Sequence, residues 1–346
     1  MSTVMQATDE VAYLCVDRYL QTLNQGVALQ SAFDYRLIDA LLDQKQLSFT
    51  ALLDIFPGDA GALEFLLDML RQGEVVDMDD AGCCLTCEFV QSLKYRDLLE
   101  AKLAFANMVA SDFADHFSLL LTNPAEFFQQ SRLFELFDYG RAYEKTEANY
   151  KHTKCWMDIT SALTRYESQA CLKHYDFSRH REMLDVGGNS GEFVMQLCRC
   201  HPQLRATVLD LPVVCEVGRA HVGDQPEAGR IRFMEVGPGL PSEQYDLVSF
   251  KSMLHDWPDE RVADFITRAF KALKPGGTLL IYERGSFDPQ RSDMGYGNLP
   301  LLLFFRSYRG AGLYRKILHQ LGMVDVHEVS LQLEMPFMLL TAQKPG

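Results

Sequence analysis

The chain has 346 residues, of which 47% are hydrophobic and 23% charged. That length and composition exclude a disordered or fibrous chain and predict two globular domains. Aspartate and glutamate total 47 against 33 lysine and arginine, and the formal net charge of -14 disfavours nucleic acid as a partner, because a phosphate backbone needs a basic surface. The start has no basic or apolar leader, no apolar run approaches the length of a membrane-spanning helix, and the nine scattered cysteines suit reduced thiols. We therefore expect a cytoplasmic protein without membrane contact.

The first hundred residues predict helices followed by a hairpin. Apolar residues recur at helical spacing over 11–42, with a break expected at 24–26. Ser48 and Asp59 are expected to cap two further helices. Two short strand-like runs then flank an Asp-Asp-Ala-Gly turn at 79–82. Helices followed by a small hairpin are typical of a winged helix.

The remainder predicts an α/β fold. Residues 98–175 look helical and rich in Phe, Leu, Met and Tyr. From Met183 onward strands and helices alternate, which indicates a Rossmann-like, doubly wound, mostly parallel sheet. Two last strand-like runs, 324–329 and 337–342, are expected at the edge or as a hairpin. The predicted division is a winged-helix dimerisation domain over 1–97, a helical connector contributing to the substrate pocket over 98–175, and a Rossmann-like catalytic domain over 176–346.

A glycine-rich turn follows the first strand of this pattern. Met183 to Val186 runs into Gly187-Gly188-Asn189-Ser190-Gly191 and then an amphipathic helix, and Asp210 ends the next strand. Ligands of open sheets bind at the carboxyl ends of strands, where an acid can accept hydrogen bonds from a ribose. A dinucleotide motif needs glycine where Asn189 stands. Asp185 suits a cationic amino-acid group better than a pyrophosphate, so the pattern favours S-adenosylmethionine; the alternative is a turn that merely closes a βα unit.

His255 is the candidate base. It follows a strand end in Leu254-His-Asp-Trp257, on the side of the sheet where Gly187 and Asp210 are expected. Imidazole takes up protons near neutral pH, and a phenol, with a reference pKa of about 10, needs a base before it attacks a methyl group. Glu283 is expected at the same rim and could orient the imidazole. The alternatives are a structural histidine and a solvated strand-end acid.

Together these motifs resemble the class I S-adenosylmethionine-dependent O-methyltransferases, of the plant caffeate and bacterial natural-product type that includes hydroxyindole O-methyltransferase-like enzymes. The resemblance spans nearly the whole chain and rests on four segments: Leu184-Asp-Val-Gly-Gly-Asn-Ser-Gly191, Val208-Leu-Asp-Leu-Pro212, Lys251 with Leu254-His-Asp-Trp257, and Leu273-Lys-Pro-Gly-Gly277 followed by Glu283. It implies activity in class EC 2.1.1.-, S-adenosylhomocysteine as a product, a small aromatic acceptor from secondary metabolism, and a homodimer formed by the N-terminal domain. It also implies that His255 deprotonates the acceptor hydroxyl and that Glu283 supports it.

The resemblance further implies a set of binding residues and no metal. The cofactor-binding set is Asp185, Gly187, Gly188, Ser190, Asp210, Leu211, Glu235, Val236, Phe250 and Lys251. The substrate-binding set is Trp156, Met157, Ile159, Asp256, Leu299 and Leu303. The groups Cys83-Cys84-x-x-Cys87 and Cys198-x-Cys200-His201 have superficial metal spacing, for which packing is the better interpretation.

The sequence departs from the family pattern at three places. Asn189 interrupts the glycine run, although asparagine tolerates left-handed dihedrals. Within Arg232 to Pro241, Gly237 stands where the family has the aspartate that binds adenine, and Glu235 is a nearby substitute. Tyr308 stands where a second supporting glutamate is expected. The departures at Gly237 and Tyr308 leave open a methyltransferase fold with non-methylating chemistry, such as hydroxylation or cyclisation. A separate alternative, from the winged-helix pattern, is a regulator that senses a ligand, although the net charge opposes it.

Overall fold

The structure is a computed structural model that describes residues 4–6, 11–237 and 244–346. Its contacts divide the chain into two compact units. The first, here the catalytic unit, comprises Met1–Val11, Phe134–Asp293 and Phe304–Gly346; the second, here the N-terminal unit, comprises Ala12–Leu133 and Met294–Leu303. The predicted connector over 98–175 is thus divided between the two, and a short segment after Asp293 joins the N-terminal unit. Each unit is described by itself.

The catalytic unit contains an eight-stranded sheet in the order β1-β10-β11-β9-β8-β5-β6-β7. Pairing is parallel except where β11 pairs with β10 and β9, which confirms the predicted α/β fold. The sequence did not predict β1 or β7. The two late strands, β10 and β11, form the antiparallel hairpin that was one of the two predicted arrangements, and neither is an edge strand. The strands are β1 (Val4–Gln6), β5 (Glu182–Val186), β6 (Arg205–Asp210), β7 (Ile231–Glu235), β8 (Tyr245–Lys251), β9 (Leu273–Arg284), β10 (Val324–Gln332) and β11 (Pro336–Gln343).

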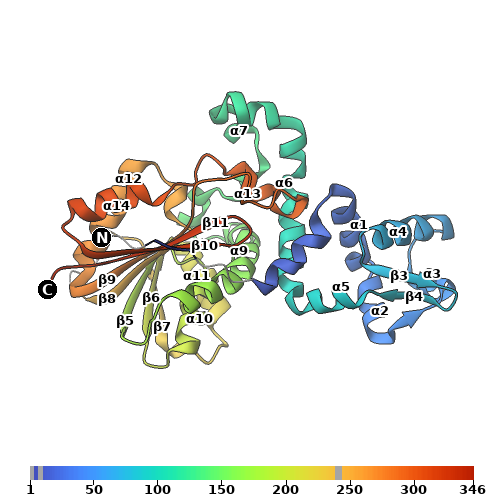
Figure 1. The fold of residues 1–346 in the computed structure, drawn as a ribbon, viewed down its shortest axis with the longest axis horizontal. Helices are drawn as coiled ribbons and strands as arrows, with labels where there is room; N and C mark the ends of the chain where they lie inside the picture. The colour runs from blue at the N-terminus through green and yellow to red at the C-terminus, as the bar shows by residue number, and fades with distance from the viewer. Residues whose placement is uncertain (1–3, 7–10, 238–243) are drawn as a thin grey trace. The chain divides into compact units, whose positions relative to one another are not determined.

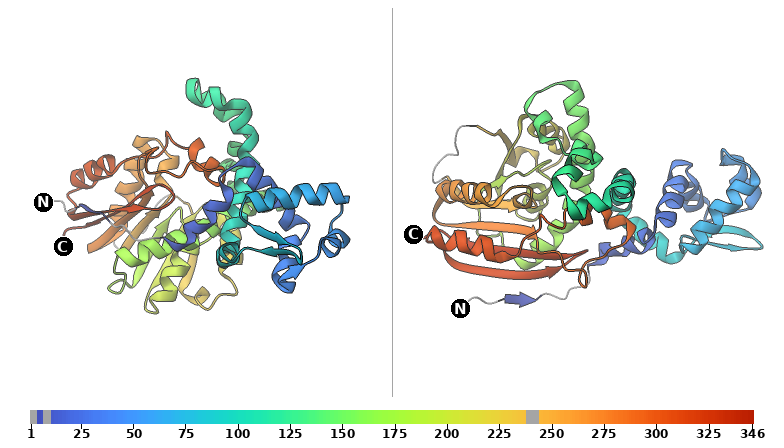
Figure 2. Two further views of the ribbon diagram at one scale, coloured as in Figure 1. Left: turned by 45° about the vertical axis from the view of Figure 1, so that its right-hand side comes forward. Right: turned by 90° about the horizontal axis from the view of Figure 1, so that it is seen from above.

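Helices cover both faces of this sheet (Figure 1). α9 (Glu147–His174) packs against α10 (Glu192–Cys200) and α11 (Pro212–Val222), and these two contact β6. On the other face α12 (Asp259–Ala272) contacts α14 (Ala311–Gln320), β8 and β9. Figure 2 shows orange α12 and red α14 side by side over the strands. None of the helices in the described part of the chain is long and apolar enough to cross a membrane.

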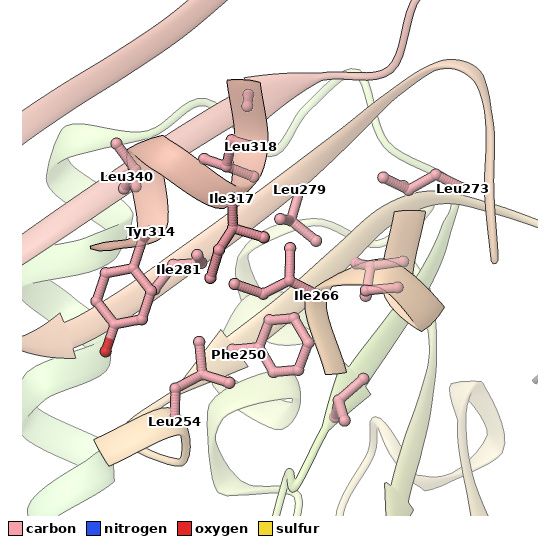
Figure 3. Packing of buried hydrophobic residues seen from close by; sticks show 14 of the residues in the cluster. Phe250, Leu254, Ile266, Leu273, Leu279, Ile281, Tyr314, Ile317, Leu318 and Leu340 are labelled. Carbon is pink, nitrogen blue, oxygen red and sulfur yellow. The ribbon is translucent and has the colours of Figure 1, made fainter. Parts of the chain in front are cut away.

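The core beneath α12 and α14 forms because apolar residues recur along these helices and along the strands below them at the spacing that places them on one face. Buried residues of α12 recur at helical spacing, among them Val262, Ile266 and Ala269, so the helix has one apolar stripe. Figure 3 shows Ile266 and Ile317 facing Phe250, Leu279 and Ile281 of the central strands. Burying one such aliphatic side chain stabilises the fold by about 1.5–3 kcal/mol. This cluster holds β8 and β9 in place. The turn that follows β8 carries His255, and β9 itself carries Glu283.

In the N-terminal unit one predicted break is wrong. The sequence placed an interruption at 24–26, but the interruption comes at Gln21–Thr22, and Gly26 lies inside α1 (Leu23–Asp34). Thr22 and Gln25 form a capping box that fixes the start of this helix. A Cβ on Gly26 would lie 2.4 Å from the ring of Tyr296, so the glycine permits close packing rather than ending a helix.

The rest of the N-terminal unit agrees with the sequence. Ser48 and Asp59 cap α3 and α4 as predicted, and the strands of the predicted hairpin pair antiparallel around the Asp79–Gly82 turn. One further strand, β2, adds to the hairpin. The elements are η1 (Ala12–Leu20), α1, α2 (Leu37–Gln44), β2 (Gln46–Leu47), α3 (Phe49–Ile55), α4 (Ala60–Gln72), β3 (Val76–Asp79), β4 (Gly82–Leu85), α5 (Cys87–Ser92), η2 (Leu93–Tyr95), α6 (Arg96–Thr122), α7 (Pro124–Gln130), η6 (Tyr296–Asn298) and α13 (Leu299–Leu303).

Candidate active site

The glycine-rich turn after β5 has the backbone shape that the sequence predicted. Gly187, Asn189 and Gly191 have φ values of 68°, 56° and 78°, in the left-handed region that glycine and asparagine tolerate. A Cβ on Gly187 would lie 2.4 Å from Met253, and one on Gly188 would lie 2.6 Å from Asp185 Oδ2. The turn therefore leaves no room for side chains at these two glycines, and backbone lines the space above the strand.

Asp210 ends β6 beside this turn. Its carboxylate accepts hydrogen bonds from the backbone N–H of Asn189 at 2.8 Å and of Leu211 at 2.7 Å. Burial raises the pKa of Asp210 to about 6, although both hydrogen bonds act against the increase. An acid fixed in this way presents its remaining acceptor positions to a ligand, as ribose binding requires.

Asp185 lies within β5 below the same turn and is fully buried. Its Oδ1 accepts a hydrogen bond from Ser249, whereas Oδ2 has no hydrogen-bond partner among the described residues. Burial raises the pKa of Asp185 to about 7, although Ser249 and the charge of Lys251 lower it. A buried acceptor without a partner is costly, and a cationic amino group is a suitable partner for it. The cofactor expected from the sequence carries such a group together with a ribose, so Asp185 and Asp210 fit it.

A cavity of about 480 Å³ opens beside these acids. Aromatic and apolar side chains dominate its wall, with a few polar groups between them, which is the usual composition of a small-molecule site. Every lining residue belongs to the catalytic unit. They are Tyr139, Gly140, Tyr143, Trp156, Val186, Gly187, Asn189, Leu209, Asp210, Leu211, Val214, Met234, Glu235, Val236, Gly237, Ser252, Met253, Asp256, Trp257, Arg261, Phe265 and Arg268.

His255 lies in a short 3-10 turn, η5 (Leu254–Asp256), directly after β8. Its Nδ1 is 2.8 Å from Glu283 Oε2, and Glu283 Oε1 accepts hydrogen bonds from the backbone N–H of Met253 and Leu254, both at 2.7 Å. Glu283 is fully buried and the His255 side chain is 11% exposed. The carboxylate thus fixes both the imidazole and the turn that carries it.

The other ring nitrogen of His255 faces a second acid. Nε2 is 3.5 Å from Asp256 Oδ1. Asp256 lines the cavity, whereas the predicted catalytic residues His255 and Glu283 are not among its lining residues. Burial lowers the pKa of His255, but the charges of Asp256 and Glu283 outweigh that effect and raise the pKa above its ordinary value. The imidazole therefore has an acid at each nitrogen.

Tyr308, at the position of the expected second glutamate, lies against His255. The two ring centroids are 5.4 Å apart, and Tyr308 is 7% exposed. Burial raises the pKa of its hydroxyl, so the phenol is neutral. The acid that the family pattern places here is thus replaced by an uncharged ring, and Asp256 is the second carboxylate near the imidazole.

Some predicted cofactor residues lie elsewhere. Phe250 is fully buried in the core under α12 (Figure 3), and Lys251 Nζ bonds to Thr164 and Glu167 of α9. The Ser190 hydroxyl is 2.6 Å from the hydroxyl of Ser161. These three side chains support the loop and the sheet. Neither they nor the predicted cofactor residues Asp185 and Gly188 are among the residues that line the cavity.

The predicted substrate residues are divided as well. Trp156 and Asp256 line the cavity, whereas Met157 and Ile159 are buried on other parts of α9. Leu299 and Leu303 lie on α13 in the N-terminal unit, where Leu303 is buried. Two of the six predicted substrate-binding residues thus line the cavity.

At the adenine end, Glu235 does not simply replace the missing aspartate. Glu235 lines the cavity but pairs with Lys145 Nζ at 2.6 Å and with Arg219 at 3.7 Å. Its pKa is lowered, first by the hydrogen bond from Lys145. Val236 and Gly237 lie beside it, and Val236 N–H donates to the Asp210 backbone. The stretch from Pro238 to Pro241 lies outside the described residues.

Sequence reasoning missed several residues that shape the site. Tyr139 donates a hydrogen bond from its hydroxyl to Asp256 Oδ2 at 3.1 Å. Met253 packs against the glycine turn, and Arg309 donates to the carbonyls of Leu254 and Trp257, either side of the His255 turn. Their positions depend on contacts between segments far apart in the chain, which no local motif specifies. Among the described residues no cluster of three or more histidine, cysteine or acidic side chains has the arrangement of a metal site.

Comparison with known proteins agrees with this geometry. The chain is 36% identical over 126 residues to the 3-hydroxy-5-methyl-1-naphthoate 3-O-methyltransferase of Streptomyces sahachiroi, a match that spans 36% of this chain and 35% of that enzyme. It is 24% identical over 299 residues to the bacteriochlorophyllide d C-20 methyltransferase of Chlorobaculum tepidum, covering 82% of each. The first match thus spans about a third of its relative.

A solved structure shares the fold over the full length. Human N-acetylserotonin methyltransferase in complex with S-adenosylmethionine superposes with a TM-score of 0.72 at 19% identity, covering 99% of this chain and 100% of that one. The profile of the O-methyltransferase domain family matches residues 121–319, more than half of the chain. The protein therefore belongs to the O-methyltransferase domain family, the class I S-adenosylmethionine-dependent type that its sequence motifs resemble.

Proposed function

We propose that this protein transfers a methyl group from S-adenosylmethionine to a hydroxyl, phenolic in character, of a small aromatic acceptor of secondary metabolism, with His255 as the general base. The observation that carries the proposal is the His255–Glu283 contact of 2.8 Å beside a cavity that also contains Gly187 and Asp210. A base, a ribose-binding acid and a glycine turn meet at one edge of one sheet.

Glu283 decides which nitrogen of His255 acts. A carboxylate at Nδ1 holds the proton of the neutral imidazole there, so Nε2 carries the lone pair. Nε2 can then take the proton of an acceptor hydroxyl placed between it and the cavity, and Glu283 and Asp256 stabilise the imidazolium that results. General-base help of this kind contributes about 10²–10⁴-fold in rate.

The remaining residues hold two reactants at reacting distance. When bound, S-adenosylmethionine supplies an electrophilic methyl group whose C–S bond breaks as the C–O bond forms, with the electron pair left on sulfur. We propose Asp185 for its amino group and Asp210 for its ribose. Tyr139 and Trp156 are aromatic residues of the cavity wall, which suits contact with a flat acceptor. Positioning two reactants in this way supplies a large part of the acceleration.

We also propose that the protein forms a homodimer through its N-terminal unit and acts in the cytoplasm. Large apolar side chains are exposed on this unit, among them Leu23, Phe49 and Phe65, and such surfaces favour association. All nine cysteines are free thiols, as a reducing compartment requires. The acidic net charge argues against use of the unit for DNA binding.

The test combines binding and turnover. Purified protein is incubated with methyl-labelled S-adenosylmethionine and a panel of phenols, and cofactor binding is measured by calorimetry. We expect methylated product from the wild type and a loss of about 10²-fold or more in kcat/KM for His255→Gln, with cofactor affinity unchanged. His319→Gln, an exposed residue at the end of α14, is the matched control.

Each outcome distinguishes a function. Full turnover by His255→Gln on every accepted phenol would remove the histidine as base. Cofactor binding without any methylated product would favour the non-methylating alternative. Absence of binding at millimolar cofactor would refute the proposed function altogether.

A further inference from the structure

Tyr139 is a residue of the site that no motif in the sequence predicted. It begins the 3-10 helix η3 (Tyr139–Tyr143) and lines the cavity. Its ring packs against Trp156 at 5.7 Å and Phe137 at 6.3 Å between centroids. Two edge-on aromatic contacts fix the direction of the phenol, and its hydroxyl donates to Asp256 Oδ2 at 3.1 Å.

The three groups Tyr139, Asp256 and His255 form a line from the cavity wall to the base. One oxygen of Asp256 accepts from Tyr139 and the other lies 3.5 Å from His255 Nε2. At the opposite nitrogen, Glu283 stands at 2.8 Å, a full hydrogen-bond distance. The Asp256 carboxylate therefore lies near Nε2 without forming the close contact that Glu283 forms with Nδ1.

This separation matters because Nε2 has to accept the acceptor's proton. A carboxylate in hydrogen-bond contact with Nε2 would favour protonation of that nitrogen, so Nε2 would already carry a proton and could not take one from the acceptor hydroxyl. Asp256 has a short side chain that can rotate about χ1 and χ2. A donor on its far oxygen is what holds it in the more distant orientation.

We propose that Tyr139 is a positioning residue that, through its hydrogen bond to Asp256, keeps that carboxylate away from His255 Nε2 and so leaves the nitrogen free to act as the base. The inference rests on the proposed function for its catalytic meaning, but the effect on His255 exists without turnover. The charged and titratable groups around the line are Glu283 and Arg284 of β9, Tyr308, and Asp210 of β6.

The test measures His255 directly. Its imidazole is titrated by NMR in the wild type and in Tyr139→Phe, Asp256→Asn and the double variant, with the resonance assigned by its loss in His255→Gln. We expect Tyr139→Phe to raise the His255 pKa by about one pH unit, as an opposite charge moving into contact does. In the Asp256→Asn background the same change should have no effect.

Kinetics give an independent readout. In Tyr139→Phe the acidic limb of the kcat/KM profile should move to higher pH by the same amount, while the KM for S-adenosylmethionine stays constant. Tyr150→Phe, a partly exposed tyrosine of α9 outside the cavity lining, is the control for removing a phenol hydroxyl.

Two results would overturn the proposal: an unchanged His255 titration in Tyr139→Phe, or a shift that persists when Asp256 is already asparagine. If no acceptor is methylated by the wild type, the proposed function fails, yet the titration still decides whether Tyr139 controls Asp256. If Tyr139→Phe does not fold, the titration of Asp256→Asn becomes the test. A His255 pKa that is not lower in Asp256→Asn than in the wild type would then overturn the proposal.

Discussion

At the scale of single residues, the chemistry is concentrated in carboxylates whose environments differ. Glu283 is buried with three hydrogen-bonding contacts, two from backbone and one with His255. Asp185 is equally buried, but one of its oxygens has no described partner. The first is a completed structural acid, whereas the second keeps one acceptor oxygen for which a cationic group would be a suitable partner.

Replacing Glu283 by glutamine tests the tautomer argument. The amide keeps the size of the side chain but loses its charge and can no longer accept at both ends, so Nδ1 of His255 is no longer held as the protonated nitrogen. We expect kcat/KM to fall by about 10²-fold, measured with the best acceptor found. Glu182→Gln, exposed at the start of β5, should leave kcat/KM unchanged; equal losses in both variants would contradict the argument.

The raised pKa of His255 predicts the pH profile. The base acts when neutral, so kcat/KM should rise with pH and reach its plateau only above the ordinary histidine value of about 6.5. The cause is the pair of carboxylates, whose charges outweigh the lowering effect of burial. A pH series with one acceptor measures the midpoint. A midpoint below 6.5 in the free-enzyme profile would mean that burial dominates.

At the scale of elements, two glycines with nearly equal φ values allow the cost of a left-handed backbone to be distinguished from the cost of a steric clash. Gly187 has φ 68° and would place a Cβ 2.4 Å from Met253, whereas Gly276 has φ 73° and nothing within 4 Å. Gly276→Ala should therefore cost only the left-handed backbone term of about 1–2 kcal/mol in unfolding free energy.

Gly187→Ala should cost that amount and in addition weaken cofactor binding, because Met253 or the turn has to move. Calorimetry with S-adenosylmethionine and denaturant unfolding are measured on both variants. Affinity equal to the wild type in Gly187→Ala would show that the turn does not depend on this contact.

Two helical glycines make a second matched pair. A Cβ added to Gly26 in α1 would lie 2.4 Å from the ring of Tyr296. A Cβ added to Gly61 in α4 would have its nearest neighbour at 3.6 Å. Alanine is favoured over glycine in a helix by about 1 kcal/mol, so Gly61→Ala should stabilise and Gly26→Ala should destabilise the protein. Thermal unfolding measures both, and the same sign for the two variants would contradict the packing role of Gly26.

At the scale of the whole molecule, buried charge organises the sheet. Glu167 of α9 pairs with Lys251 of β8 and Arg284 of β9, and Arg284 also pairs with Glu334. Burial acts to raise the pKa of Glu167, but the charges of Arg284 and Lys251 outweigh it and lower the pKa to about 2. This contribution to stability is present above the unfolded-state pKa and is lost as pH falls toward 2.

Three groups of the site have pKa values that are raised, whereas that of Glu167 is lowered. The pKa values of Asp185 and Asp210 are raised to about 7 and about 6 by burial, and that of His255 is raised mainly by Asp256 and Glu283 against burial. A raised folded pKa gives stability that is complete below the unfolded value and is lost as pH rises through the folded value.

The unfolding free energy without cofactor should therefore fall between about pH 5 and pH 7.5, a window that follows from these shifts. Asp185→Asn should make the unfolding free energy fall less steeply with pH. Asp224→Asn, at an exposed position, should leave this pH dependence unchanged. Denaturant unfolding at a series of pH values measures the slope. Stability that increases over this window would show that these groups do not control it.

Much of this protein could be predicted from local pattern. The strand, the glycine turn, Asp210 at the next strand end and His255 28 residues before Glu283 are all short-range signals. They predicted the sheet, the cofactor side and the base, because dihedral preferences and strand alternation depend on near neighbours.

Other features depend on contacts between residues that are far apart in the sequence. Gly26 was assigned to a break because a glycine usually interrupts a helix, but its role depends on Tyr296, 270 positions away. The family resemblance implied that Phe250 and Lys251 bind the cofactor. In the structure the side chain of Phe250 packs in the core and that of Lys251 pairs with Glu167, because side chains alternate across a strand. β7 was missed although it positions Glu235.

The sequence by itself thus determined the fold class and the cofactor type, and it predicted His255 as the base with Glu283 as its supporting acid, since each is encoded in one segment or in a fixed spacing. Only the tertiary structure decided what surrounds the base: Asp256 near Nε2, Tyr139 on its other oxygen, and Tyr308 where a glutamate was expected. The contacts of Tyr139 and Tyr308 join segments more than 100 and about 50 residues apart, and no local preference specifies them. Long-range packing sets them, because it brings η3 and the segment after α13 to the end of β8 only when the whole catalytic unit has folded.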